Sequence, residues 1–308
     1  MNVFLTGATG YIGSALLPAL ISAGHTVTAL VRDDAKAERV RGLGAVPVIG
    51  SIDDRDLVRR LAAGTDAVIA TASPGDQSSS TVETAFADAV LDGLRPGGTF
   101  VRTGGVWVHG SGAEITERTP RNAPDLVAWR EALDTRVLSA PGIRSLLVEP
   151  GLVYGHGKGI ITYVVGAEQA GGEQAGGEQA GAGQAGEPAA LRLVGPGTQH
   201  WTSVHVDDLA ELYLATLTHG ATGEVFLGVS GDNPTVRELG EAASHRLGLQ
   251  GRVVPEAPDA LVDRLGGFGA ALLLDQQATG EKARTVLGWK PSRPSLLDDI
   301  AGGGYDPQ

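Results

Sequence analysis

The sequence predicts an α/β protein with a doubly wound parallel sheet and a smaller, mostly helical C-terminal part. Two observations support this fold class. Short apolar runs alternate with helical patterns over the first 150 residues, and a glycine-rich turn joins the first apolar run to the first helix. The chain has 308 residues, which suits one large α/β domain with a smaller appendage.

The apolar runs predict buried parallel strands, because a strand that is covered by helices on both faces is apolar along its whole length. These runs lie at 3–6, 26–31, 46–49, 67–71, 99–103 and 145–149. The helical patterns between them lie at 12–23, 35–43, 55–63, 81–94 and 125–139. Six strands that alternate with helices indicate right-handed crossovers within one sheet.

The C-terminal third is too irregular for a second unit of this kind, and we expect it to bind substrate. Its expected strands or short extended segments lie at 191–194, 203–206 and 225–228. Its expected helices lie at 207–217, 234–248, 258–274 and 275–287, with a last turn at 296–300. We therefore assign 1–155 and about 203–230 to the sheet domain, and 156–202 and 231–308 to the substrate-binding part.

Residues 167–188 repeat Ala, Gly, Glu and Gln with a period of five. At about 100° per residue, this period keeps no side chain on a constant helix face, and such small polar side chains cannot bury a core. Two interpretations stay open: a tolerated surface insertion, or a lid over the substrate pocket.

The first strand–helix junction carries the clearest motif. Residues 4–13 are FLTGATGYIG, which spells G-x-x-G-x-x-G between a strand and a helix. The first glycine makes the tight turn, the second lets the backbone approach a pyrophosphate, and the third lets the helix pack on the strand. Exposed N–H groups at the positive helix end then bind the phosphates. The motif predicts a Rossmann-type dinucleotide site that includes Thr6, Gly7, Thr9, Gly10, Tyr11 and Ile12.

The end of the second strand indicates which dinucleotide is bound. NAD binders usually carry an acidic residue there, which holds the ribose hydroxyls. Here Arg32 comes first and Lys36 follows. Because a guanidinium stacks on adenine and pairs with a 2′-phosphate, we expect NADP(H). The alternative is that Arg32 faces solvent and Asp33 binds the ribose.

Composition excludes several classes of function. The net charge of −12 disfavours nucleic-acid partners, and the absence of cysteine removes disulfides and thiol chemistry. The seven histidines lack metal-binding spacing, so we expect no metal site. Neither a signal peptide nor an apolar run of about 18 residues is visible, so we expect a cytoplasmic protein without a membrane partner.

Several further segments resemble the extended short-chain dehydrogenase/reductase superfamily, over nearly the whole chain. These are GSIDD at 50–54, ATA at 70–72, EPGLVYG at 149–155 and VHVDDLA at 204–210. In that family the first two lie against the adenine and the ribose, and the third lines the nicotinamide. The resemblance adds nine expected cofactor contacts: Ser51, Ile52, Ala70, Thr71, Ala72, Thr103, Pro150, Gly151 and Val153.

The family's reductases use a Ser, a Tyr and a Lys, and this chain departs at all three positions. Segment 103–110, TGGVWVHG, is similar to the family's serine segment and places Gly105 at the serine. Counting back from Asp134 places Leu126 at the tyrosine and Arg130 at the lysine. The guanidinium can hydrogen-bond the ribose or a substrate oxygen, but its pKa above about 12 prevents proton transfer.

Residues Tyr154 and Lys158 do spell Tyr-x-x-x-Lys, but two glycines within the segment disfavour the helix that would align them. Three sources of the proton stay open: another side chain, water, or an acidic group of the substrate such as a phenol beside its ketone. The side chains considered, each of which could instead be structural, are Thr103, His109, Tyr154 and His205.

An altered triad beside an insertion is similar to the atypical ketoreductases of actinobacterial antibiotic pathways. This resemblance implies an NADPH-dependent ketoreductase that acts on a flat aromatic, polyketide-type (angucyclinone-like) ketone. One alternative is a non-catalytic NADP(H)-binding sensor or regulator. Another is a nucleotide-sugar epimerase or dehydratase, which Leu126 disfavours because that chemistry uses the tyrosine. The oligomeric state, monomer or homodimer, is left open.

Overall fold

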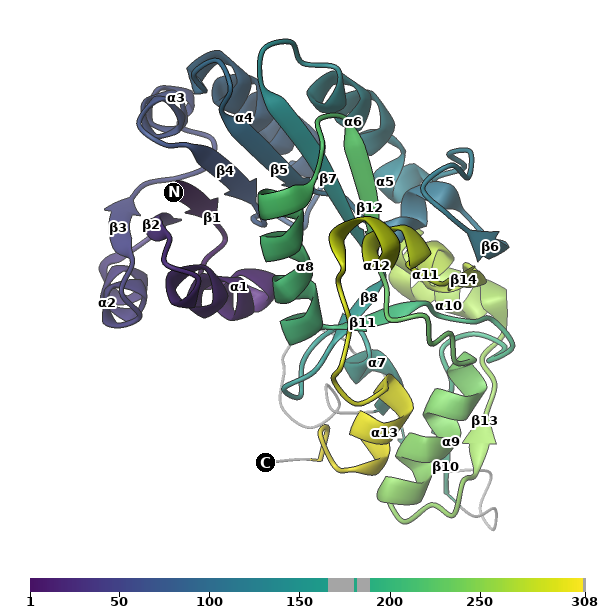
Figure 1. The fold of residues 1–308 in the computed structure, drawn as a ribbon. Helices are drawn as coiled ribbons and strands as arrows, with labels where there is room; N and C mark the ends of the chain where they lie inside the picture. The colour runs from purple at the N-terminus through teal and green to yellow at the C-terminus, as the bar shows by residue number, and fades with distance from the viewer. Residues whose placement is uncertain (166–179, 182–188, 307–308) are drawn as a thin grey trace.

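Seven parallel strands form the central sheet of the computed structural model, which describes residues 1–165, 180–181 and 189–306 (Figure 1). Every neighbouring pair in this sheet is parallel. The predicted doubly wound sheet is confirmed, and residues 224–228 add a seventh strand at its edge. In spatial order the strands are β12 Glu224–Gly228, β7 Arg144–Pro150, β5 Thr99–Thr103, β4 Ala67–Ala70, β1 Asn2–Thr6, β2 Thr26–Val31 and β3 Val46–Ile49.

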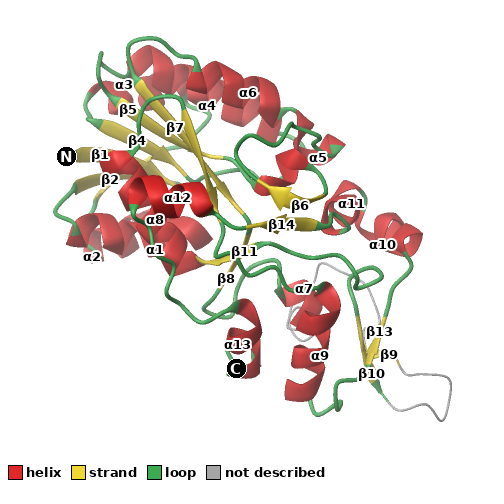
Figure 2. Ribbon diagram, turned by 45° about the vertical axis from the view of Figure 1, so that its right-hand side comes forward, coloured by secondary structure: helices red, strands yellow, loops and turns green. Residues whose placement is uncertain are grey.

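Helices cover both faces of the sheet (Figure 2). One face carries α1 Tyr11–Ser22, α2 Asp34–Gly42, α8 Val206–His219 and α12 Glu281–Leu287, and the other carries α3 Arg55–Ala63, α4 Ser79–Gly93 and α6 Arg130–Leu138. Successive side chains of a strand point to opposite faces. Accordingly, Val3 and Leu5 pack into the core under the first group, whereas Phe4 packs into the core under the second. The first strand is therefore buried on both sides.

A second apolar core lies beside the carboxyl ends of the strands, in the lower part of Figure 1. It is built around Tyr154, Trp201 and Leu261. The helices that contribute to it are α7 Thr162–Val165, α9 Val236–Arg246, α10 Pro258–Leu265, α11 Gly267–Leu272 and α13 Leu296–Ala301.

Short strand pairs connect this part to the sheet domain. The strand β8 Leu152–Tyr154 pairs in parallel with β11 Ser203–His205, and β6 Gly112–Ile115 pairs with β14 Gln276–Ala278. The remaining short elements are β9 Ala180–Gly181, β10 Ala190–Arg192, β13 Val253–Val254, the 3-10 helix η1 Val106–His109 and α5 Asp125–Ala128.

Three of the expected helices need correction, and short strands were missed. The helix expected at 275–287 was wrong at its start, because 276–278 pairs with β6 and the helix begins at Glu281. The helix expected at 258–274 is divided at Gly266, which has a φ of +59°. The helix expected at 125–139 is interrupted at Trp129. The strands β6 and β8 were not predicted at all.

The repeated segment 167–188 lies outside the described residues, apart from the backbone of 180–181. The two interpretations of it, surface insertion or lid, therefore stay predictions.

Candidate functional site

The carboxyl ends of the sheet strands border three adjoining cavities. A cleft of about 620 Å³ lies over the glycine-rich turn, and an apolar cavity of about 180 Å³ lies beyond β5 and β7. A small cavity of about 50 Å³ shares Thr71 and Ser73 with the cleft, and Thr103 and Arg130 with the apolar cavity. The three cavities therefore adjoin one another in a row along the strand ends, where open α/β sheets bind ligands.

The glycine-rich turn has the geometry of a phosphate-binding loop. Gly7 has a φ of +74°, and a Cβ there would lie 2.7 Å from the Thr71 hydroxyl oxygen. A Cβ on Gly13 would lie 2.0 Å from the carbonyl oxygen of Gly7. Helix α1 begins after Gly10, with no side-chain cap and no acidic residue in its first turn. Its first N–H groups and positive end are thus available to an anion.

The far end of the cleft is lined by two cations. Arg32 and Lys36 both line it, and the Arg32 guanidinium has no hydrogen bond or ion pair to another residue in the described ranges. Asp33 is not among the lining residues. Its carboxylate caps α2, where it accepts from the Lys36 N–H at 2.8 Å and pairs with the Lys36 ammonium. The hydrogen bonds from Lys36 lower the pKa of Asp33, which is therefore already committed as an anion to that cap.

The expected cofactor contacts are brought together along this row of cavities. Every one of them except Thr6 lines at least one of the three cavities. Thr6 lies beneath them, where its carbonyl oxygen accepts from the Thr71 hydroxyl at 2.7 Å. Residues that are not among the expected contacts also line the cleft; Gly50 and Asp53 belong to the GSIDD segment, and the others are Leu30, Val31, Ser73, Pro74, Ser78 and Val82.

The apolar cavity is where a reacting group would meet the cofactor. Its walls contain one charged side chain, that of Arg130, and one hydroxyl, that of Thr103. Glycines, a proline and apolar side chains make up the rest: Ile12, Gly104, Gly105, Val106, Trp107, Val127, Pro150, Gly151, Leu152, Val153 and Ile160. Such a wall suits an apolar ligand with a single oxygen-rich end.

The three altered positions occupy different places. Gly105 and Arg130 both line the apolar cavity, and a Cβ on Gly105 would lie 3.5 Å from an Arg130 nitrogen (Nη1). Leu126 is 41% exposed and does not line it; the neighbouring Val127 does. Neither Leu126 nor Val127 offers a hydroxyl, so the cavity wall lacks the family's proton donor at either position.

Of the four side chains considered as proton donors, only Thr103 lines the cavity. Its hydroxyl is hydrogen-bonded to that of the fully buried Tyr213. His109 is buried between the Glu149 carboxylate (2.9 Å) and a backbone carbonyl.

The other two donors considered lie away from the cavity. The Tyr154 hydroxyl donates to the carbonyl of Pro294 at 2.7 Å, and burial raises its pKa. His205 caps α8 by accepting from the Asp207 N–H at 3.1 Å. The Tyr-x-x-x-Lys segment is not helical, because Tyr154 ends a strand and Gly155 has a φ of +115°.

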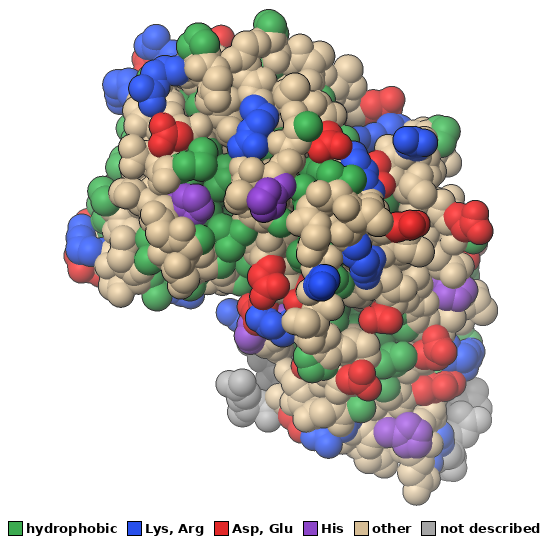
Figure 3. Space-filling view, viewed as in Figure 1, with side chains coloured by type: hydrophobic (Ala, Val, Ile, Leu, Met, Phe, Trp, Pro, Cys, Tyr) green, Lys and Arg blue, Asp and Glu red, His purple; other side chains and the backbone are tan. Residues whose placement is uncertain are grey.

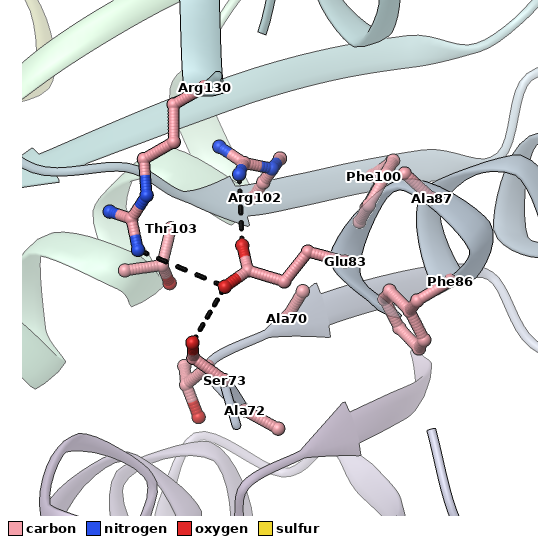
Figure 4. Close-up of a pocket in the computed structure, with 11 residues that line it drawn as sticks. Ala70, Ala72, Ser73, Glu83, Phe86, Ala87, Phe100, Arg102, Thr103 and Arg130 are labelled. Atoms are coloured by element: carbon pink, nitrogen blue, oxygen red, sulfur yellow. Dashed lines mark hydrogen bonds and ion pairs between the residues drawn. The ribbon is translucent and has the colours of Figure 1, made fainter. Parts of the chain in front are cut away.

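A buried network of charges lies behind the cavity (Figure 4). Glu83 of α4 accepts from the Ser73 hydroxyl at 2.6 Å and from Arg102 at 3.0 Å, and it lies 3.8 Å from Arg130. Arg102 also pairs with Asp134, whose pKa burial raises to about 6. The network continues through Arg121, which pairs with both Asp134 and Glu149.

Outside the cavities, one group of side chains has metal-ligand character within the described ranges. It consists of His156, His205 and Asp207, with their ligand atoms within 4.8 Å of one another. Asp207 already pairs with neighbouring side chains, since its carboxylate lies 3.1 Å from His156 and 3.6 Å from Arg293. The sequence did not predict this group.

On the face shown in Figure 3, acidic and basic side chains are interspersed over most elements. Within the described residues, every helix is too short or too polar to cross a lipid bilayer.

Comparison with known proteins places this geometry in context. A family model described as NAD(P)H-binding matches residues 7–150. An uncharacterized protein of Schizosaccharomyces pombe is 26% identical over 99% of this chain and 100% of its own length. The 3-diazoavenalumate denitrifying reductase of a Streptomyces species is 27% identical over 97% of this chain and 99% of its own length.

Two further likenesses concern a short segment of the sequence and the fold, respectively. A 4-hydroxy-2-methyl-3-oxo-4-farnesyl-3,4-dihydroquinoline-1-oxide ketoreductase of Stigmatella aurantiaca is 42% identical, but over 21% of this chain and 20% of its own length. The structure of the dTDP-glucose 4,6-dehydratase DesIV of Streptomyces venezuelae, with NAD and TYD bound, superposes with a TM-score of 0.76 at 21% identity. It covers 99% of this chain and 96% of the dehydratase chain. Residues 7–150 are therefore similar to the NAD(P)H-binding family model, and the chain shares the fold of this dehydratase.

Proposed function

We propose that this protein is an NADPH-dependent ketoreductase, within the broader class of NAD(P)-dependent oxidoreductases. The observation that carries the proposal is that the dinucleotide cleft and an apolar cavity of about 180 Å³ both share lining residues with one small cavity between them. When bound, the reduced coenzyme supplies a hydride. The glycine turn, the bare end of α1 and the cations Arg32 and Lys36 fit its phosphates.

The substrate that we propose is a flat aromatic ketone of the polyketide type. The cavity walls are apolar, with Trp107 available to stack on a planar ring and Arg130 as the one charged group. The similarity to the reductase and ketoreductase named above supports a carbonyl or related reduction. We base an angucyclinone-like substrate, and a relation to the ketoreductase that acts at C7 of simocyclinone's angucyclinone, on the altered catalytic positions together with the insertion at 167–188.

In this proposal the residues of the chain orient the ketone and stabilise the charge that develops on its oxygen. Thr103 is the one hydroxyl of the cavity wall, and Tyr213 behind it fixes its orientation. Residues 156–202 and 231–308, which include much of the second apolar core, would contribute the substrate-binding part.

Two alternatives have specific support. The missing hydroxyls at Gly105 and Leu126 favour a non-catalytic NADP(H) sensor, which would bind the coenzyme without turnover. The likeness to the dehydratase favours nucleotide-sugar chemistry. A sugar nucleotide is strongly polar, however, and the apolar cavity offers it few partners.

The proposal is tested by stopped-flow oxidation of NADPH with a panel of phenolic ketones and quinones, and with NADH in parallel. A ketoreductase oxidises NADPH stoichiometrically with formation of the alcohol. Tight NADPH binding in calorimetry without oxidation by any member would instead support the sensor. Turnover of a nucleotide sugar without net oxidation of added NADPH would support the third function.

A further inference from the structure

Arg130 lies at the junction of two cavities. It lines the small cavity together with Thr71, Ala72 and Ser73, which also line the dinucleotide cleft, and it is the one charged residue of the apolar cavity. Figure 4 shows its guanidinium reaching down toward Thr103 and Glu83. A cofactor in the cleft and an apolar ligand in the cavity would thus meet beside this side chain.

The guanidinium is incompletely hydrogen-bonded by the protein. Its Nη1 donates to the carbonyl of Gly104 at 3.0 Å, and its Nη2 is 3.8 Å from the nearest Glu83 oxygen, which is beyond hydrogen-bond range. Its Nε is buried with no partner among the described residues. A guanidinium has five N–H donors, and a buried donor without a partner is costly. These donors therefore call for an oxygen that the described residues do not supply.

Gly105 has no side chain beside this guanidinium. A Cβ there would lie 3.5 Å from Arg130 Nη1, so a longer side chain would compete with the guanidinium for the same space. Relative to the family's pattern, the cavity lacks the serine hydroxyl and has an arginine in place of the lysine. Burial lowers the pKa of Arg130, but an arginine in a protein still stays protonated at neutral pH.

We propose, building on the ketoreductase function, that Arg130 binds the reacting oxygen and selects carbonyl compounds whose reduced oxygen is a weak base. The carbonyl carbon gains the hydride, the oxygen takes the electron pair of the broken π bond, and the dihydronicotinamide is oxidised. Arg130 stabilises the resulting oxyanion without giving up a proton, and water supplies the proton that completes the alcohol. Quinones meet this condition, because their reduced oxygen is a phenolate, and vicinal diketones approach it, whereas simple alkyl ketones do not.

The first test compares Arg130→Met and Arg130→Lys with Arg136→Met, a matched control on the same helix. Arg136 is half-exposed and pairs with Asp88 on the surface of the sheet domain. For the preferred substrates we expect Arg130→Met to lower kcat by about 10²–10³-fold, with a smaller change in KM. We expect Arg130→Lys to recover part of this loss and Arg136→Met to behave as wild type.

Across a series of carbonyl compounds, the wild-type rate should rise steeply as the pKa of the product hydroxyl falls, and Arg130→Met should flatten that dependence. Equal rates on alkyl ketones and quinones of similar size would overturn the proposal. So would an Arg130→Met variant that keeps the wild-type dependence on product pKa.

A second test needs no turnover. 4-Nitrophenol is titrated spectroscopically in the presence of the protein and NADP⁺. Wild type and Arg136→Met should bind the phenolate, so that the pKa of 4-nitrophenol is lower when it is bound. We expect its acid dissociation constant to rise about tenfold or more on binding, and Arg130→Met should abolish this change. Binding of the neutral phenol alone would overturn the anion site. If no carbonyl is reduced but the phenolate still requires Arg130, then the ketoreductase function fails and the anion site stands.

Discussion

The two ends of the cleft differ in how closely they follow their family's pattern. At the dinucleotide end, Gly7 and Gly13 lie so close to their neighbours that a Cβ at either position would meet atoms at 2.0–2.8 Å. At the reacting end, Gly105 faces an arginine where the family has a hydroxyl. The first end is shaped by backbone geometry, and the second by side-chain chemistry.

This difference teaches where a fold tolerates change. Phosphate binding depends on N–H groups that the backbone places, so any side chain at the close approaches disturbs it. Proton transfer depends on a few side chains on a rigid scaffold, which can be exchanged while the scaffold remains. The charged network behind Arg130 shows the cost of such an exchange, since each of its carboxylates needs a cation nearby.

We expect the largest effect from removing Arg102, a cation in the buried charge network behind the apolar cavity. Arg102 is 4% exposed and holds both Glu83 and Asp134. Arg102→Met would leave these carboxylates short of a cation in a buried site, so we expect a loss of about 3–5 kcal/mol in the free energy of unfolding. Urea unfolding would measure this. Arg95→Met, which breaks a pair on the surface, serves as the control and should change stability little.

If Arg102→Met proved as stable as the control, the buried carboxylates would be protonated or hydrated. The reacting end would then not depend on charge balance. In any case the change in the free energy of coenzyme binding should be smaller than the change in the free energy of unfolding, because Arg102 does not line the dinucleotide cleft.

We expect the second-largest effect from adding a side chain in the glycine-rich turn, at the dinucleotide end of the cleft. In Gly13→Ala the new Cβ would meet the Gly7 carbonyl oxygen at 2.0 Å, so α1 must move away from the turn. We expect a loss of about 1–3 kcal/mol in the free energy of unfolding, and a weaker NADPH affinity by at least tenfold. Calorimetry and thermal unfolding would measure the two quantities.

Gly42→Ala is the matched control, since its Cβ would meet nothing within 4 Å. Wild-type affinity in Gly13→Ala would show that the close approach is relieved without moving the phosphate-binding N–H groups, and would contradict the backbone origin of this end.

How far the sequence predicts each end follows from the same contrast. The glycine turn was predictable because its signal is local: three glycines between a strand and a helix. The partners of Arg102 and Glu149 were not, because Glu83 and Asp134 are distant from Arg102 in the chain, as Arg121 is from Glu149. A signal did exist, since Arg102 and Glu149 stand in runs that otherwise predict buried strands, and a buried charge requires a partner. Which residue supplies that partner depends on the packing of α4 and α6.

Elements formed by non-local pairing were missed for the same reason. Residues 276–278 continue a helical pattern in the sequence, yet they pair with β6, more than 160 residues earlier in the chain. The interruption at Trp129 likewise moved Val127, rather than Leu126, into the cavity wall. Counting residues along an assumed continuous helix could not reveal this shift.

We expect the third effect from removing Arg32, which tests how the dinucleotide end distinguishes NADPH from NADH. Arg32→Ala removes a cation that lines the cleft and lacks a protein partner within the described ranges. If it binds the 2′-phosphate, the loss of a charge-assisted hydrogen bond should weaken NADPH about 10–100-fold and leave NADH nearly unchanged. Arg39→Ala, an exposed position on α2 outside the cleft, is the control. An equal loss for both coenzymes would instead indicate that Arg32 stacks on the adenine.

The smallest expected effect concerns His205, which lies at neither end and which was considered as a proton donor. Burial lowers the pKa of its imidazole below the ordinary value of 6.5, and its Nδ1 accepts from the Asp207 N–H. The folded protein therefore binds fewer protons here than the unfolded chain does. The stabilisation is complete above about pH 6.5 and is lost as the pH falls through the pKa of the folded state.

His205→Asn keeps a side-chain acceptor at the start of α8 but does not titrate. Between roughly pH 7 and pH 5, urea unfolding should show wild type losing up to about 1 kcal/mol more than the variant, while turnover at pH 7 stays within about twofold. A turnover loss of 10²-fold or more would make His205 the proton donor. The reacting end would then extend past the apolar cavity, and Arg130 would no longer be the group that manages the charge on the substrate oxygen.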